Sequence, residues 1–145
     1  MKTILCVDDD GWVLEMLKES LEGQGYRVLV TTNTDVAPAC LKFETVDLVL
    51  LDLNMPTKDG FSVYREIQAI QHVPVLFVSG CARTFNERAS QLRSENSNGT
   101  SAGQFDFLPK PFSLAALFEK IEAMLKLPTV VRKISVPTKA PQPVS

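Results

Sequence analysis

The chain has 145 residues, of which 45% are hydrophobic and 22% are charged, and its formal net charge is −2. This length fits one domain with a buried core, and the composition is that of an ordinary globular protein. The charge balance excludes the strongly basic face that nucleic-acid-binding proteins use, so we expect no direct nucleic-acid partner.

Several other classes of protein are also excluded. No apolar stretch approaches the roughly 18 residues of a membrane helix, so we expect no membrane insertion. The N-terminus has one lysine followed by an acidic triplet, unlike a signal peptide. The three cysteines, Cys6, Cys40 and Cys81, lack the spacing of metal ligands, and Cys6 has the setting of a small core residue. We therefore expect a cytoplasmic protein.

The first half of the chain alternates short apolar runs with helix-period segments. Thr3–Val7 and Tyr26–Thr31 predict strands because they are short, apolar and rich in branched side chains. Gly11–Glu22 predicts an amphipathic helix capped by Asp9 or Asp10. A second helix is predicted over Asn33–Glu44, where Pro38 falls in a tolerated first turn.

The second half continues the alternation, with two interruptions. The remaining predicted elements are strands over Asp47–Leu51, Val73–Val78 and Phe105–Leu108, and helices over Gly60–Ile70 and Leu114–Leu125, the last with Ser113 as its N-cap. The polar segment Gln91–Gly103 predicts that the fourth helix ends after about two or three turns in a flexible loop. Residues 128–145 contain four prolines and predict a disordered tail or linker.

The pattern of elements predicts an α/β fold with a doubly wound, five-stranded parallel sheet. Nearly all-apolar strands indicate burial on both faces, and strand–helix alternation indicates parallel pairing with right-handed crossovers. Ligands of such sheets bind outside the carboxyl ends of the strands. The candidate site is therefore expected at that edge.

Carboxylates gather at the predicted edge. Asp8-Asp9-Asp10 ends the first strand, and Asp52 ends the third. At a separation of about 5 Å and an effective dielectric of about 20, each charged pair repels by roughly 3 kcal/mol. Such a cluster favours binding of a proton or of a hard, oxygen-preferring divalent cation.

Two further polar residues fall at the same edge. Taken singly, each of these residues has an ordinary structural explanation. A serine after the fourth strand, Ser79, typically caps the following loop, and a lysine after the fifth, Lys110, is typically solvated. The aspartate triplet is typical of a turn that caps a helix. Together, three carboxylates, a hydroxyl and an ammonium suit a divalent cation with a phosphoryl group.

At these residues the sequence resembles the receiver domains of response regulators in two-component signalling. The resemblance covers residues 1–127 and lies in ILCVDDD, in LDLNMP with Asp59-Gly60 after it, in PVLFVSG and in AGQFDFLPKPF. It implies a flavodoxin-like fold with strand order 2-1-3-4-5, and often a cis bond between Lys110 and Pro111.

The resemblance also implies residue roles. Asp52 matches the phosphoacceptor, Lys110 the active-site lysine, Ser79 the switch hydroxyl and Phe107 the aromatic residue that changes rotamer. The implied ligands of Mg²⁺, or of Mn²⁺ as a substitute, are Asp8, Asp9, Asp52 and the backbone carbonyl of Asn54.

The implied function is a phosphoacceptor switch that takes a phosphoryl group from a sensor histidine kinase or a phosphotransfer protein and signals to a downstream protein. Such a domain promotes its own phosphorylation and dephosphorylation but is not a turnover enzyme. The family's output face is formed by the fourth helix, fifth strand and fifth helix. Lys110 follows Ser79 by 31 positions, about nine more than the family's usual spacing, and the extra residues are expected within Gln91–Gly103.

Two alternatives remain at this point. Haloacid-dehalogenase-type phosphatases also phosphorylate a strand-end aspartate, but they use a second aspartate two positions on, where this chain has Asn54. A pseudo-receiver would act as a protein-interaction module without phosphorylation. The only histidine, His72, precedes the fourth strand and is not expected to donate a phosphoryl group.

Overall fold

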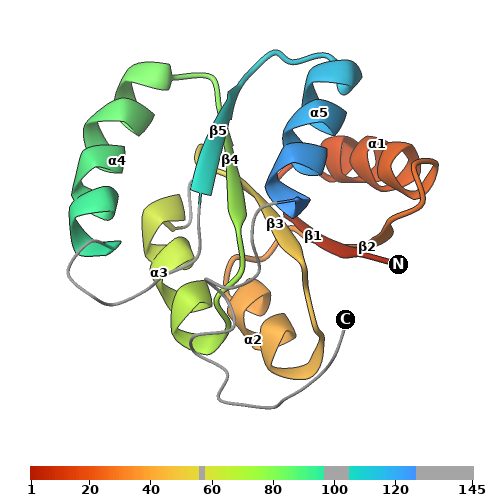
Figure 1. The fold of residues 1–145 in the computed structure, drawn as a ribbon, viewed down its shortest axis with the longest axis horizontal. Coiled ribbons are helices and arrows are strands. Elements are labelled where there is room, and N and C mark those ends of the chain that lie inside the picture. The colour runs from red at the N-terminus through yellow and green to blue at the C-terminus, as the bar shows by residue number, and fades with distance from the viewer. Residues whose placement is uncertain (56–57, 97–104, 127–145) are drawn as a thin grey trace.

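The computed structural model describes residues 1–55, 58–96 and 105–126, which form one parallel sheet between two layers of helices (Figure 1). The sheet has five strands in the order β2-β1-β3-β4-β5, with every neighbouring pair parallel. The strands are β1 (Thr3–Val7), β2 (Arg27–Thr31), β3 (Leu48–Asp52), β4 (Val75–Ser79) and β5 (Phe105–Pro109). This confirms the predicted fold class and the strand order implied by the resemblance.

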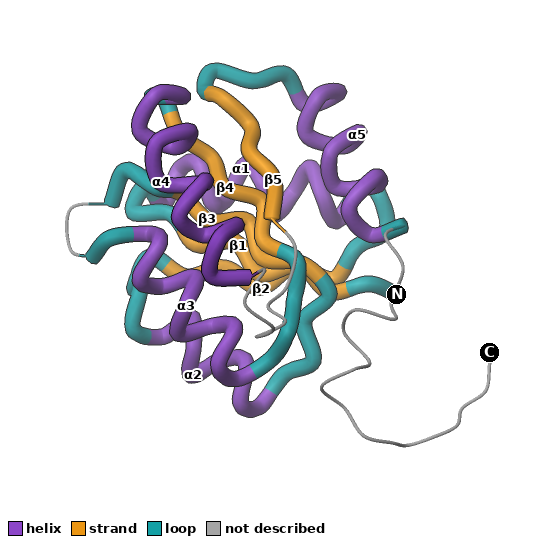
Figure 2. Tube along the Cα trace, turned by 60° about the vertical axis from the view of Figure 1, so that its left-hand side comes forward, coloured by secondary structure: helices purple, strands orange, loops and turns teal. Residues whose placement is uncertain are grey.

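Five helices cover the sheet. They are α1 (Gly11–Glu22), α2 (Val36–Phe43), α3 (Gly60–Ile70), α4 (Ala82–Asn96) and α5 (Leu114–Leu125). Helices α1 and α5 lie on one face, and α2, α3 and α4 lie on the other, which comes forward in Figure 2. Within the described ranges, no helix combines the length and apolar character needed to cross a bilayer.

The core has two halves because successive strand side chains point to opposite faces. In β1, Leu5 and Val7 pack under α2–α4, whereas Ile4 and Cys6 pack under α1 and α5. Cys6 is 0% exposed, as expected for a core residue, and β1 is paired on both sides, with β2 and β3. The first strand is therefore enclosed on both edges and both faces, as are β3 and β4.

Three helices match their predicted bounds; β2, β3 and β5 differ from theirs by one residue at one or both ends, and the larger differences at the starts of α2 and β4 have local causes. Helix α2 begins at Val36 rather than Asn33, because the Asn33 side chain accepts the Asp35 N–H at 2.8 Å and forms a turn first. Strand β4 begins at Val75 rather than Val73, because the Val73 N–H and carbonyl both bind the Gln68 side chain. These backbone groups are satisfied outside the ladder.

The prediction of a short fourth helix is wrong. Helix α4 has 15 residues, about four turns, so Gln91–Asn96 are helical rather than part of a loop. Its buried residues Phe85, Ala89 and Leu92 follow an i, i+4, i+7 pattern, and their packing stabilises a helix that its polar composition disfavours. Residues 97–104 of the predicted loop, and the predicted tail 128–145, lie outside the described residues.

The extended α4 leads to a stability prediction at Leu92, which is 1% exposed. Leu92→Ala should lower the free energy of unfolding by about 2–4 kcal/mol, because it removes buried methyl groups and leaves a cavity. Urea unfolding followed by circular dichroism would measure this. Gln91→Ala, at the exposed neighbouring position, is the control and should change stability little. A near-zero effect at Leu92 would mean that the helix does not pack there.

Candidate functional site

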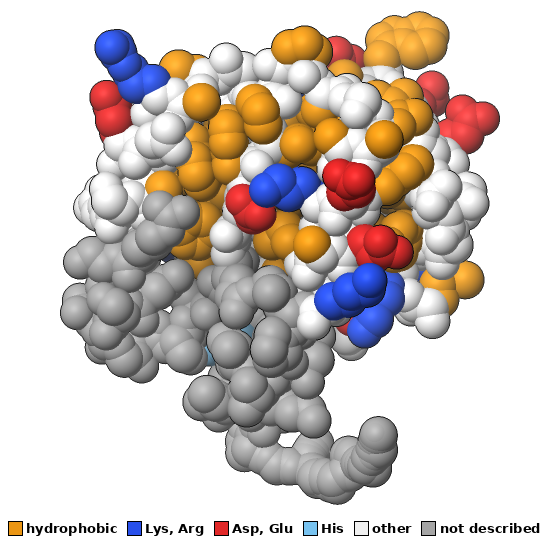
Figure 3. All heavy atoms as spheres, turned by 45° about the horizontal axis from the view of Figure 1, so that its top comes forward, with side chains coloured by type: hydrophobic (Ala, Val, Ile, Leu, Met, Phe, Trp, Pro, Cys, Tyr) orange, Lys and Arg blue, Asp and Glu red, His pale blue; other side chains and the backbone are white. Residues whose placement is uncertain are grey.

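The carboxyl edge of the sheet brings three aspartates together. Val7 is paired with Leu51 in the β1–β3 ladder, so Asp8, the next residue, lies beside Asp52. A carboxylate oxygen from each of Asp8, Asp9 and Asp52 lies within 4.8 Å of the others. Asp8 and Asp52 are buried and Asp9 is exposed. Figure 3, in which this edge comes forward, shows acidic and basic side chains close together among apolar ones.

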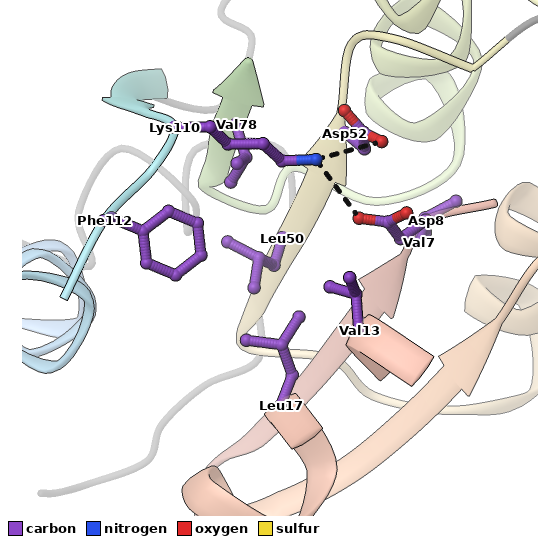
Figure 4. A pocket seen from close by; sticks show the side chains of 9 residues that line it. All are labelled: Val7, Asp8, Val13, Leu17, Leu50, Asp52, Val78, Lys110 and Phe112. Atoms are coloured by element: carbon purple, nitrogen blue, oxygen red, sulfur yellow. Dashed lines mark ion pairs between the residues drawn. The ribbon is translucent and has the colours of Figure 1, made fainter. Parts of the chain in front are cut away.

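Lys110 supplies the positive charge of the site. Its Nζ lies 3.5 Å from Asp52 Oδ2 and 3.7 Å from Asp8 Oδ2 (Figure 4). The Lys110 N–H donates to the Ser79 carbonyl at 2.8 Å, which extends the β4–β5 pairing to the base of this side chain. The peptide bond to Pro111 is cis, as the resemblance implied.

Each buried carboxylate uses its two oxygens differently. Oδ1 of Asp52 accepts the Asn54 N–H at 3.0 Å, and Oδ1 of Asp8 accepts the Asp10 N–H at 2.9 Å. The Oδ2 atoms face Lys110. Backbone hydrogen bonds thus orient both side chains, and the cluster presents several carboxylate oxygens, the donor set that suits Mg²⁺.

The pKa of Asp8 reflects its burial and the charges that surround it in the cluster. Its pKa is raised to about 6, mainly because burial disfavours the charged form. The Asp52 and Asp9 carboxylates act in the same direction, whereas the Asp10 N–H and Lys110 act against it. Lys110 therefore compensates only part of the negative charge, and a divalent cation would relieve the rest.

Ser79 and Phe107 lie on the face of the sheet that α2, α3 and α4 cover. Ser79 continues the side of β4 on which Val75 and Phe77 pack under α2–α4. Its Oγ donates to Asn54 Oδ1 at 3.4 Å and accepts the Cys81 N–H at 3.0 Å. It is thus connected to the carboxylate site through Asn54.

Phe107 lies outside the carboxylate cluster. Its ring stacks on Phe85 of α4, with centroids 4.4 Å apart and an interplanar angle of 14°. The structure therefore brings together Asp8, Asp9, Asp52 and Lys110, connects Ser79 to Asp52 by two hydrogen bonds through Asn54, and leaves Phe107 against α4.

Sequence reasoning missed the apolar floor of the site. A pocket beside Lys110 is lined by Val13 and Leu17 of α1 and by Phe112, together with strand residues (Figure 4). The helix predicted over Gly11–Glu22 did not by itself place Val13 and Leu17 at the site. Phe112, two positions after Lys110, was the available signal.

Gly60 was also missed as a close contact. A Cβ there would lie 2.6 Å from Leu53 Cδ2, 3.3 Å from Leu53 Cα and 3.5 Å from the Asp52 carbonyl oxygen, so the first turn of α3 lies against the Asp52–Leu53 segment. The Asp59-Gly60 pair in the sequence was the signal, because glycine permits such close approach.

Comparison with known proteins agrees with this geometry. Residues 4–122 match the family model of the response regulator receiver domain. The transcriptional regulatory protein CpxR of Klebsiella pneumoniae is 36% identical over 126 residues, 87% of this chain and 50% of that protein. The nisin biosynthesis regulatory protein NisR of Lactococcus lactis is 33% identical over 85% of this chain and 50% of that protein. The chain spans about half the length of both relatives.

Solved structures show the same fold. The non-phosphorylated HemR receiver domain from Leptospira biflexa matches with a TM-score of 0.71 and 31% identity, covering 88% of this chain and 97% of that chain. A CheY-like receiver domain protein from Methanospirillum hungatei matches with a TM-score of 0.73 and 28% identity, over 86% and 94% of the two chains.

The expectation of no nucleic-acid partner is not supported by these relatives. CpxR is named a transcriptional regulatory protein, and this chain spans only half of its length. The net charge of −2 is that of these 145 residues, and it does not exclude nucleic-acid binding by a longer protein that contains such a chain.

Proposed function

We propose that this chain, which belongs to the response regulator receiver domain family, is a phosphoacceptor switch with Asp52 as the acceptor. The single observation that carries the proposal is the position of Lys110, whose ammonium lies within 4 Å of both buried carboxylates. One cation shared by two strand-end aspartates is suited to holding the oxygens of an incoming phosphoryl group. The proposed receiver domain spans residues 1–127.

In the proposed reaction, Asp52 Oδ2 attacks the phosphorus atom of a phosphohistidine or of a small acyl phosphate. A carboxylate O–P bond forms, and the bond from phosphorus to the donor's leaving group breaks. The Asn54 N–H holds Oδ1 of Asp52, so the other oxygen is oriented for attack. Lys110 stabilises the negative charge on the transferred oxygens, because it already faces this oxygen at 3.5 Å.

The carboxylate cluster is proposed to hold Mg²⁺, with Mn²⁺ as a substitute. Asp8, Asp9 and Asp52 would be ligands, together with the backbone carbonyl of Asn54. Their mutual repulsion, and the raised pKa of Asp8, fit a site that a divalent cation completes. When bound, the ion supplies charge neutralisation for the phosphoryl oxygens.

The switch is proposed to use Ser79 and Phe107. The Ser79 hydroxyl now donates to Asn54 and would donate to the phosphoryl group after transfer, since that group brings new acceptor oxygens. Phe107 would then change rotamer against Phe85, its present stacking partner. In this way a local change of charge would reach α4.

The proposed partners follow from this chemistry. The donor is a sensor histidine kinase or a phosphotransfer protein in the cytoplasm, and the output is a downstream protein target. The chain would promote its own phosphorylation and dephosphorylation rather than turn over a metabolite.

The test is incubation of the purified chain with a small acyl phosphate and Mg²⁺, followed by intact-mass measurement after an acid quench. We expect one phosphoryl mass per chain, and none when a chelator removes the ion. A folded chain that gains no phosphoryl group with Mg²⁺ present would overturn the proposal in favour of the pseudo-receiver.

A further inference from the structure

Helix α4 is joined to the start of α3 by one arginine. Arg88 Nη2 lies 2.7 Å from Asp59 Oδ2, and its guanidinium carbon lies 4.6 Å from the centroid of the Phe61 ring. The ring is buried, whereas both charged side chains are part-exposed, at 38% and 41%. Arg88 therefore contacts the surface of α3 through its charge and through the flat face of its side chain.

Asp59 connects this ion pair to the phosphoacceptor. Its other oxygen, Oδ1, accepts the Phe61 N–H at 3.3 Å and caps α3. The next residue, Gly60, lies beside the Asp52–Leu53 segment: a methyl group there would lie 2.6 Å from Leu53 Cδ2 and 3.3 Å from Leu53 Cα, and would be in van der Waals contact with the Asp52 carbonyl oxygen at 3.5 Å. The path from Arg88 to Asp52 thus consists of an ion pair, a helix cap and a backbone contact, each in place in the structure.

A second contact joins the same helix to the switch aromatic. Phe85, one turn before Arg88, stacks on Phe107 and lies 6.3 Å from Phe61, centroid to centroid. Helix α4 therefore touches both the strand that carries Phe107 and the helix start that supports Asp52. A change at either place has a direct route to α4.

We propose that Arg88 is a positioning residue for the phosphoacceptor, acting through Asp59 and Gly60, and that it couples the position of α4 to Asp52. This inference rests on the proposed function, and it assigns to Arg88 the regulation of phosphorylation at Asp52 by α4. A part-exposed ion pair contributes little to folding, so its role is geometric rather than stabilising. Because coupling between sites is reciprocal, phosphorylation at Asp52 should also alter α4.

The test is a double-mutant cycle at the ion pair. Arg88→Met keeps a stem over Phe61 but removes the charge, and Asp59→Asn keeps an oxygen to cap α3 but also removes the charge. The labelling rate with acyl phosphate is measured for each variant and for the double variant. Mg²⁺ affinity is followed by fluorescence of the single tryptophan, Trp12, whose backbone N–H donates to Asp10 Oδ1 beside the cluster.

We expect each single variant to label about threefold to tenfold more slowly and the double variant to be no slower than either, since both remove one interaction. Arg83→Met, a charge removal at an exposed site of the same helix, should label at the wild-type rate. Arg88→Lys should recover part of the loss. Urea midpoints should stay near that of the wild type.

The second readout is amide hydrogen exchange across α4 with and without acyl phosphate. Phosphorylation should change exchange over residues 85–92 in the wild type, and this change should shrink in Arg88→Met. Wild-type rates in both single variants, faster labelling, or effects that multiply in the double variant would overturn the inference alone. Absence of labelling in the wild type would overturn the proposed function and this inference with it.

Discussion

Asp52→Asn should take up phosphoryl groups from acyl phosphate at least about a thousandfold more slowly than the wild type, because an amide oxygen is a poor nucleophile. The substitution preserves the local structure. An amide oxygen can still accept the Asn54 N–H that now binds Oδ1 of Asp52, and Lys110 retains its contact with Asp8. Intact-mass measurement over time gives the rate directly.

The control for this prediction is Asp106→Asn. Asp106 is a carboxylate on β5 that pairs with Lys120 at 2.9 Å and is not part of the aspartate cluster. It should label at the wild-type rate. If Asp52→Asn were labelled as fast as this control, the acceptor would be a different residue and the assigned role of Asp52 would be wrong.

Asp8→Asn should stabilise the metal-free protein at pH 8 by up to about 3 kcal/mol. The pKa of Asp8 is raised from 3.8 to about 6, so the folded state binds a proton that the unfolded state has already released. The stability that this proton contributes is present below about pH 4 and is lost as the pH rises through about 6. An uncharged asparagine does not have this loss, and its oxygen can still accept the Asp10 N–H.

The gain should therefore be pH-dependent. Urea unfolding of wild type and variant in chelator should give similar free energies at pH 4 and a growing difference up to about pH 7. Asp9→Asn is the matched control, because Asp9 is exposed and should gain little, although both variants should bind Mg²⁺ more weakly. A variant less stable than the wild type at pH 8 would show that the contact of Asp8 with Lys110 outweighs its burial.

The sequence predicted most of the fold because its local signals agree with one another. The apolar runs around Cys6 and Leu50 could be read as strands without any knowledge of their neighbours, and their alternation with helices left few topologies. The start of α2 and the extent of α4 could not be predicted in this way. Each depends on a particular contact: the Asn33 turn in one case, and Leu92 in the core in the other.

In the candidate site, too, the features that depend on local sequence could be predicted and those that depend on tertiary contacts could not. Strand-end residues such as Asp8 and Asp52 were predictable, because parallel strands bring their carboxyl ends to one edge. Contacts made by side chains from distant segments were not. Nothing in the spacing of Asp59 and Arg88 indicates that they meet, since an ion pair across 29 positions depends on how two helices are placed.

The enclosure of Cys6 in β1, a strand with a neighbour on each side, gives the chain an internal chemical reporter. Its thiol has a pKa raised to about 12 by burial, so at pH 8 only about one molecule in ten thousand carries the reactive thiolate, and no reagent reaches it. Cys40 is partly accessible and Cys81 exposed, so both can be blocked in the native state. The thiol that then remains becomes available to an alkylating reagent when β1 leaves both of its neighbours. Its rate of modification therefore measures the opening of the whole sheet, in a protein that needs no engineered probe.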